Sequence, residues 1–266
     1  MVFSSCTGTE CSPLSFTSDS FVCACDESYC DFIGEVLTPD EGSYRRVISS
    51  RDSFRFEIVD GVDDVTASGD TLIVINHDYE YQSMLGFGGA FTDSTGINVV
   101  SLSETLQNQL LRSYFSPSGI EYNIGRIPIA GSDFSTYAYS YDEVDGDVDL
   151  EYFALTDEDF NYKIPLIQKA IAMSNKEIRL FGSPWSPPSW MKENGMLNGT
   201  GGLLVEMRDP FANYLIKFVQ AYESYNLTIW GITPQNEPLT GFEDWAWNTC
   251  AWSAEDMRDF IKNNMG

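Results

Sequence analysis

The sequence predicts an α/β protein: about the first half of a (β/α)8 barrel, preceded by an N-terminal β-rich, disulfide-containing segment. Three observations support this prediction. From residue 86 onward, short apolar strands alternate with amphipathic helices, which is the pattern of parallel βαβ units. Polar and aromatic residues gather just after each strand, where a barrel carries its active site. Before residue 82 the chain shows strand-like alternation instead of helical periodicity.

We expect three parts along the chain: a cysteine-rich β segment, strands of an all-β accessory domain, and the half barrel, at residues 1–34, 35–81 and 82–266 respectively. In the second part Phe54, Phe56 and Ile58 alternate with polar neighbours, and the apolar run 71–75 predicts a short buried strand. This antiparallel unit is too small to close on itself.

The predicted barrel elements follow in order. Short apolar strands are expected at 124–129, 179–181 and 228–233. One helix begins near Thr156, and Asp209 with Pro210 opens another, with Asp as the N-cap and Pro at the first helical position. The apolar stripe of this second helix predicts a core-facing side; it consists of Phe211, Tyr214, Leu215, Phe218, Val219 and Tyr222. Ser253 caps a last helix.

The cysteines indicate an oxidising compartment. Five of the six lie within the first thirty residues, and Cys250 stands far from them; the five are Cys6, Cys11, Cys23, Cys25 and Cys30. No CxxC pair occurs and His77 is the only histidine, so we expect neither a zinc site nor another metal or cofactor. A local set of disulfides fits better, although six cysteines leave the connectivity open.

Charge and targeting signals narrow the function classes. The 40 Asp and Glu residues against 15 Lys and Arg give a formal net charge of −25. This balance argues against binding nucleic acid or anionic membranes through bulk charge. It fits a protein that works in acid, although for the charge alone a merely soluble, acidic protein is the simpler explanation. Residues 1–6 show no basic or apolar leader, so we expect any signal peptide to be absent from this sequence. The sequons at Asn198 and Asn226 agree with a secretory route.

The sharpest chemical signal is the segment 230–238, WGITPQNEP, in which a strand ends in Asn236, Glu237 and Pro238. Glycoside cleavage needs one carboxyl group to protonate the leaving oxygen and a second on the other face of the sugar. An Asn next to the acid is a suitable donor to the sugar 2-OH. A lone Glu is more often a solvated loop carboxylate, but the strand, the proline and the flanking aromatic residues favour a catalytic acid.

Several ordered motifs resemble glycoside hydrolase family 30, the family of the glucosylceramidases, over nearly the whole chain. They are GFGGAFTD at 86–93, YFS at 114–116, GIEYNIGRIP at 119–128, SDFS at 132–135, KIPLI at 163–167, SPWSPPSWMK at 183–192 and TPQNEP at 233–238. The resemblance implies that Glu237 is the acid/base and that Asn236 contacts the 2-OH. It also implies that Asp133 and Trp185 hold sugar hydroxyls and that Arg126 orients the catalytic carboxylates.

Each assignment has a structural alternative. Asp133 could instead form an Asx turn or cap a helix, and Trp185 could simply pack in the core. For Trp190 the core and the site are equally good explanations. Arg126 lies in a strand and would be an uncompensated buried charge unless it meets carboxylates. Asp93, after the glycine-rich strand, suits a structural role better than a catalytic one.

The resemblance further implies a retaining β-glucosidase that cleaves the glucosyl–ceramide bond of glucosylceramide, in the lysosome or after secretion. The nucleophile of this family sits on a later barrel strand and no residue here matches it, so we expect this chain alone to be inactive. The alternatives are a truncated, non-catalytic fragment that binds glycolipid, and a related β-glycosidase with another sugar.

The resemblance also implies partners and disulfides. A glycosphingolipid substrate, a saposin-type activator protein and peripheral contact with lysosomal membrane lipid are expected, and nucleic acid is not. The implied disulfides are Cys11–Cys23 and Cys25–Cys30, which leaves Cys6 as an additional cysteine.

Overall fold

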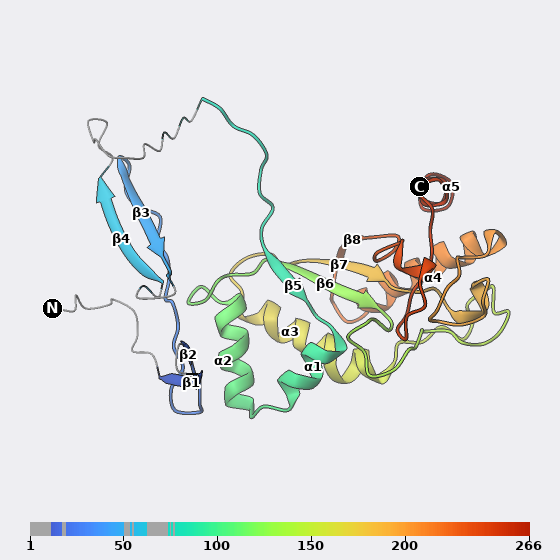
Figure 1. Cartoon of the computed structure of the whole chain (residues 1–266), viewed down its shortest axis with the longest axis horizontal. Helices are drawn as coiled ribbons and strands as arrows, with labels where there is room; N and C mark the ends of the chain where they lie inside the picture. The colour runs from blue at the N-terminus through green and yellow to red at the C-terminus, as the bar shows by residue number, and fades with distance from the viewer. Residues whose placement is uncertain are drawn as a thin grey trace.

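The computed structural model describes residues 12–17, 20–50, 54, 56–62, 74, 76 and 78–266. Its centre is a four-stranded parallel sheet in the order β5-β6-β7-β8 (Figure 1), with strands Gly88–Ala90, Ile124–Ile129, Arg179–Pro184 and Ile229–Ile232. Strands that follow one another in sequence are therefore neighbours in space. This is the arrangement expected for about half of a (β/α)8 barrel.

Helices connect these strands, in line with the predicted alternation of strands and helices, although the two helices between β5 and β6 were not predicted individually. They are α1 (Asp93–Val100) and α2 (Glu104–Phe115) after β5, a π-helical turn η1 (Asp159–Lys163) that continues into α3 (Ile164–Met173) after β6, α4 (Arg208–Glu223) after β7, and α5 (Ala254–Asn264) after β8. Short 3-10 turns lie in the connecting loops, at Ser189–Met191, Val205–Met207 and Thr240–Phe242. Ser253 caps α5 as predicted, because its hydroxyl accepts from the Asp256 N–H.

The strand register brings the backbones very close at the glycine-rich start of the sheet. Gly88 lies opposite Ile124, and a side chain at Gly88 would place its first carbon 1.6 Å from the Ile124 carbonyl oxygen. Only glycine fits such an approach. Since all four strands run in the same direction, their carboxyl ends meet at one edge of the sheet.

Helix α4 supplies much of the core, and its predicted stripe is largely confirmed. Five of the six stripe residues are buried, and Val219 is half-buried. Phe218 stacks on Tyr141 with ring centres 6.3 Å apart and lies against Gly182 of β7. The helix starts at Arg208 with Met207 at the N-cap position, two residues before the Asp209 cap that we expected. Pro210 still fits there, because the N–H groups of the first turn have no helical partner.

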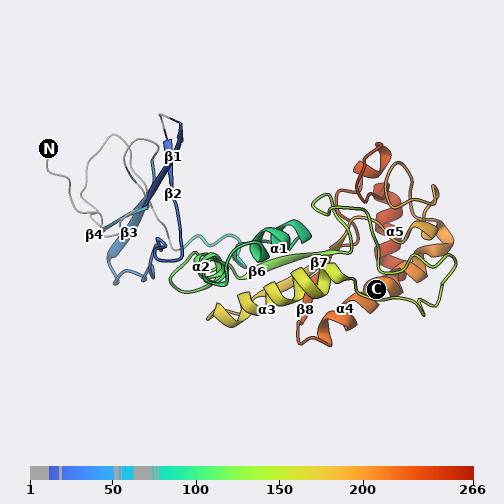
Figure 2. The same ribbon diagram turned by 90° about the horizontal axis from the view of Figure 1, so that it is seen from below.

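The N-terminal part contains two antiparallel strand pairs, β1 (Pro13–Thr17) with β2 (Ser20–Cys23) and β3 (Ser43–Ile48) with β4 (Glu57–Val62). Figures 1 and 2 show both pairs at one end of the molecule, away from the four-stranded sheet. That they belong to an all-β accessory domain with the predicted boundaries stays a prediction.

The expected strand content of residues 44–81 needs one correction. Ile58 lies in β4, but Phe54 precedes that strand and Phe56 has a φ of 50°. A left-handed backbone is incompatible with a strand, so the alternation from Phe54 did not indicate one. Apart from Val74, the expected strand 71–75 lies outside the described residues.

The disulfide Cys25–Cys30 is formed, as the resemblance implies. Cys23 is also disulfide-bonded, whereas Cys11 and Cys6 lie outside the described residues, so the implied Cys11–Cys23 pair stays a prediction. Cys250 is a free thiol and fully buried. Within the described parts of the chain, no helix is both long and apolar enough to cross a bilayer.

Candidate active site

The predicted site residues gather at the carboxyl edge of the parallel sheet. Asp133 follows β6, Trp185 follows β7 directly, and Asn236 with Glu237 follows β8. The chain after β8 continues along β7, because the Asn236 N–H donates to the carbonyl of Pro184 over 2.8 Å. Three consecutive strand ends thus place these side chains at one edge.

Arg126, in β6, joins the residues from the next two strands. Its Nη2 donates to Ser183 Oγ over 2.9 Å and to Asn236 Oδ1 over 2.7 Å. Its guanidinium carbon lies 4.6 Å from the centre of the Trp185 ring, within the range of a cation–π contact. The side chain is half-buried and held in place from three directions.

Both predicted functional carboxylates act electrostatically on Arg126. Burial lowers the pKa of Arg126, and the negative charges of Asp133 and Glu237 oppose this shift. An arginine stays protonated under such conditions. We expected Arg126 to meet carboxylates. Among the described residues it forms no direct ion pair with one, and it interacts with Asp133 and Glu237 only through longer-range electrostatics. Its hydrogen bonds go to Ser183 and Asn236.

The contact with Arg126 also fixes the Asn236 amide. Because Oδ1 accepts from Arg126, the amide NH2 is left as the free donor of this side chain. Such a donor can bind a sugar hydroxyl next to the acid. The sequence-based role of Asn236 and the observed orientation are therefore compatible.

Glu237 has an unusual backbone. Its φ is 38°, and its carbonyl accepts from both the N–H and the hydroxyl of Thr240, at 3.0 Å and 2.8 Å. Left-handed conformations of non-glycine residues are uncommon and concentrate at functional sites. The side chain is exposed, so its carboxyl group is accessible to a substrate.

The two tryptophans differ in their surroundings. Trp185 is only 6% exposed and contacts Arg126. This position is compatible both with core packing and with a role beside the predicted site residues. Trp190 packs against the hydrophobic core, and its indole N–H donates to the carbonyl of Asp142 over 3.0 Å. The structure thus favours the core explanation for Trp190.

The turn that carries Asp133 is built by its serine neighbours. The Ser132 N–H donates to Ser135 Oγ over 3.0 Å, and the Phe134 N–H donates to Ser132 Oγ over 3.1 Å. Asp133 itself is exposed and, among the described contacts, forms no Asx turn. Its carboxylate is therefore available to a ligand.

Three neighbours of the site were missed at the level of sequence. Ser183 Oγ lies 2.6 Å from Thr233 Oγ1 and accepts from Arg126, while Gln235 donates to the carbonyl of Trp185 over 2.7 Å. All three lie inside the quoted motifs. Their position at the ends of strands could have indicated that they lie near the site. Serine, threonine and glutamine side chains alone, however, indicate no particular chemistry.

The other predicted positions lie at the periphery. The Asn198 amide donates to the carbonyl of Ala246 over 3.2 Å, whereas Asn226 is exposed with a φ of 60°. In the loop after β8, Trp245 and Trp247 stack at 4.6 Å and Phe242 is exposed. No cluster of three or more potential metal ligands occurs among the residues that the structure describes.

Comparison with known proteins identifies relatives. The glycosyl hydrolase family 30 TIM-barrel domain matches residues 84–266. The lysosomal acid glucosylceramidase of Mus musculus is 42% identical over 262 residues, which cover 96% of this chain and 51% of the mouse protein. An endo-1,6-beta-D-glucanase of Neurospora crassa is 35% identical over 196 residues, covering 70% of this chain and 39% of the relative.

A solved structure has a similar fold. SrfJ from Salmonella typhimurium matches with a TM-score of 0.72 and 29% identity, covering 79% of this chain and 46% of SrfJ. The chain spans about half the length of the curated relatives it matches.

Proposed function

Because the chain belongs to glycosyl hydrolase family 30, we propose that it supplies the acid/base half of a retaining β-glucosidase that hydrolyses glucosylceramide. The observation that carries the proposal is the arrangement around Arg126, which contacts Asn236 and Trp185 and responds to the charges of Asp133 and Glu237. Four side chains that could bind or protonate a sugar thus lie around the Arg126 guanidinium; they are Asp133, Trp185, Asn236 and Glu237.

In the first chemical step a second carboxylate attacks the anomeric carbon while the Glu237 carboxylic acid protonates the glycosidic oxygen. The C–O bond breaks, the ceramide alcohol leaves with the proton, and a glycosyl-enzyme ester forms. In the second step the Glu237 carboxylate takes a proton from water, whose oxygen attacks the same carbon and releases the second carboxylate. Glucose leaves with retained configuration.

The remaining side chains bind the sugar in this proposal. The free amide NH2 of Asn236 donates to the 2-OH, a contact that strengthens as the transition state develops. The exposed carboxylate of Asp133 accepts from other hydroxyls, and Trp185 offers an apolar wall. Arg126 keeps Asn236 oriented and offsets the charge of two nearby carboxylates.

The attacking carboxylate is not among the assigned residues. Glu243 and Asp244 lie in the same loop as Glu237, whereas the nucleophile must attack from the other face of the sugar. We propose that residues outside this sequence supply the nucleophile and that the 266 residues alone do not turn over substrate. A non-catalytic, glycolipid-binding fragment is the alternative for a product limited to these residues.

The decisive experiment replaces Glu237 in the complete enzyme that contains this chain. Glu237→Ala should abolish hydrolysis of glucosylceramide and other poor leaving groups, whereas an activated aryl β-glucoside should still form the glycosyl-enzyme. Azide, which needs no general base, should then restore turnover and yield the β-glucosyl azide. Glu243→Ala is the matched control from the same loop and should retain hydrolysis. Wild-type hydrolysis by Glu237→Ala would refute the assignment.

A second candidate is a related enzyme of different specificity, favoured by the similarity to the endo-1,6-beta-D-glucanase. The same Glu237 would then protonate a sugar alcohol instead of ceramide. Parallel assays of the complete enzyme on glucosylceramide, β-1,6-glucan and aryl xylosides and galactosides separate the two. Preference for glucosylceramide supports the first proposal.

The cellular setting belongs to the same proposal. The relationship to a lysosomal enzyme, the disulfide Cys25–Cys30 and the acidic balance support a lysosomal or secreted protein. A glycosphingolipid substrate, a saposin-type activator and contact with lysosomal membrane lipid are the partners we propose. Occupied glycans at Asn198 and Asn226 would support the secretory route.

A further inference from the structure

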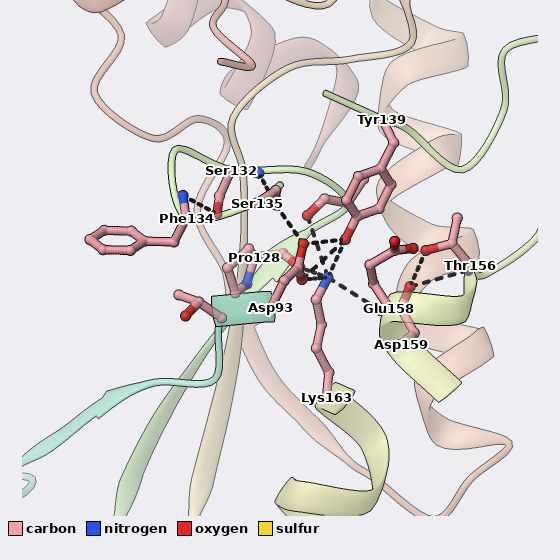
Figure 3. Close-up of polar contacts among 12 residues, drawn as sticks. Asp93, Pro128, Ser132, Phe134, Ser135, Tyr139, Thr156, Glu158, Asp159 and Lys163 are labelled. Carbon is pink, nitrogen blue, oxygen red and sulfur yellow. Dashed lines mark hydrogen bonds and ion pairs between the residues drawn. The ribbon is translucent and has the colours of Figure 1, made fainter. Parts of the chain in front are cut away.

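A buried ionic cluster adjoins the turn that carries Asp133 (Figure 3). At its centre lies Lys163, whose side chain is 0% exposed, with Nζ at 3.2 Å from Asp93 Oδ1 and 3.4 Å from Asp159 Oδ1. Asp159 and Lys163 both lie in the π-helical turn, an element frequent at functional sites. Such charges persist in a protein interior only when they are paired and hydrogen-bonded.

The lysine fixes the carboxyl end of β6. Its Nζ donates to the carbonyls of Pro128 and Ala130 over 3.3 Å and 3.4 Å, and to the hydroxyl of Tyr139 over 3.0 Å. Ala130 has a φ of 62°, a conformation that persists only where the surroundings hold it. The chain therefore leaves β6 in a direction set by Lys163.

Asp93, the first residue of α1, holds the far side of the same turn. Its Oδ2 accepts from Ser135 Oγ over 2.5 Å and from the Tyr139 hydroxyl over 3.0 Å. Next to it, the Ser94 N–H donates to the carbonyl of Phe134 over 3.1 Å. Two residues of α1 thus bind the turn, Asp93 through its side chain and Ser94 through its backbone N–H.

Asp133 lies between these attachment points. Ser132 and Ser135 bond to each other, and Phe134 is bound through its carbonyl. The side chains of Asp133 and Phe134 extend to solvent, and of these two only Asp133 carries a charge. Burial and the neighbouring carboxylates raise the pKa of Tyr139, so its hydroxyl stays protonated and remains a donor. The turn is therefore held in one position before any sugar binds.

We propose that Asp93, balanced by Lys163, is a positioning residue that acts through Ser135 to aim the Asp133 carboxylate at the sugar. The inference rests on the proposed function, in which Asp133 binds sugar hydroxyls. In this proposal the hydrogen bond between Ser135 and Asp93 raises the affinity for the sugar, although neither side chain contacts the substrate. It also explains why a carboxylate with no catalytic contact is buried at the end of a glycine-rich strand.

The test uses the complete enzyme and an aryl β-glucoside, with Ser135→Ala because Asp93 variants can fail to fold. Ser135→Ala should lower kcat/KM about tenfold, mainly through KM, because a small displacement of a binding group is enough for such a loss. Ser135→Thr, which keeps the hydroxyl, should restore the wild-type value. Tyr139→Phe should show a loss of the same kind, while Tyr137→Phe, which removes an exposed hydroxyl bonded to Glu158, should not.

A double-mutant cycle separates positioning from mere stability. In an Asp133→Ala background, Ser135→Ala should cause no further loss, because the group that it positions is gone. Losses that multiply in that background, or wild-type kinetics of Ser135→Ala, would overturn the proposal. Absence of any glucosidase activity in the wild-type enzyme would instead refute the proposed function, so the two failures are distinguishable.

Discussion

Asn236 shows how a single side chain can be oriented by a residue far away in sequence. Its amide oxygen is bound by Arg126, 110 positions earlier, and its NH2 is left for a ligand. The residue type suggests a hydrogen-bonding role, but only the contact determines which end of the amide faces the substrate.

We expect Asn236→Ala to lower kcat/KM for an aryl β-glucoside at least about tenfold, because the 2-OH contact strengthens in the transition state. The matched control is the 2-deoxy substrate, on which wild type and variant should differ little. Steady-state kinetics of the complete enzyme on both substrates measure this. An equal loss on both would show that Asn236 acts otherwise than through the 2-OH.

Asp142 is a buried carboxyl group, and only one of its two oxygens accepts a hydrogen bond within the described part of the chain. Its Oδ1 accepts from the Val144 N–H over 3.2 Å, and its Oδ2 has no donor among the described residues. Burial raises the pKa of Asp142 to about 6, and the nearby Asp147 carboxylate acts in the same direction, while the Val144 N–H opposes it.

This shift predicts a pH-dependent stability. A carboxyl pKa raised above the unfolded value of 3.8 makes the folded state bind the proton more tightly. The resulting stability is complete below the unfolded pKa and is lost as the pH rises through about 6. Asp142→Asn should therefore flatten the fall in melting temperature between about pH 4 and pH 7. Asp145→Asn, an exposed neighbour, is the control, and an unchanged slope in Asp142→Asn would contradict the prediction.

At the scale of elements, α4 connects the helical layer to the sheet. Phe218 is fully buried, stacks on Tyr141 and packs against Gly182 of β7. Ile216 lies on the same helix but is 51% exposed. The apolar periodicity that predicted this helix therefore also predicted which face of it is buried.

Phe218→Ala should destabilise the complete enzyme by about 3–5 kcal/mol, because it removes apolar contacts and leaves a cavity. Ile216→Ala should change the free energy of unfolding by no more than about 0.5 kcal/mol. Urea denaturation followed by tryptophan fluorescence measures both. Similar losses in the two variants would mean that the two helix faces do not differ as the structure indicates.

At the scale of the whole molecule, the parallel sheet is open at both sides. Among the described strands, β5 and β8 each have only one neighbour. Trp230 of β8 is 55% exposed, and Phe87 just before β5 is 68% exposed. A closed barrel has no strand edges, and unpaired edges with apolar neighbours promote association.

We therefore expect the 266-residue chain alone to lack a cooperative thermal transition and to show no turnover. Circular dichroism melting and an aryl β-glucoside assay of this polypeptide test the expectation, with the complete enzyme as the positive control. A cooperative melt together with activity would contradict it and would place the nucleophile inside these residues.

The sequence alone determined the alternation of strands and helices and the position of the candidate residues after successive strands. Apolar periodicity and turn residues are local signals, so β6, α4 and the cap at Ser253 could be predicted directly. Local signals failed at Phe56, where alternation resembled a strand but the backbone is left-handed, and they placed the start of α4 two residues too late.

Only the tertiary structure decided which side chains meet. The bond from Arg126 to Asn236 and the ion pair of Lys163 with Asp93 both depend on packing between distant segments. A charged residue in a predicted buried strand or helix indicates that it must have an oppositely charged or hydrogen-bonding partner. Which partner it finds is settled by the parallel register, because that register brings residues far apart in sequence to the same edge of the sheet.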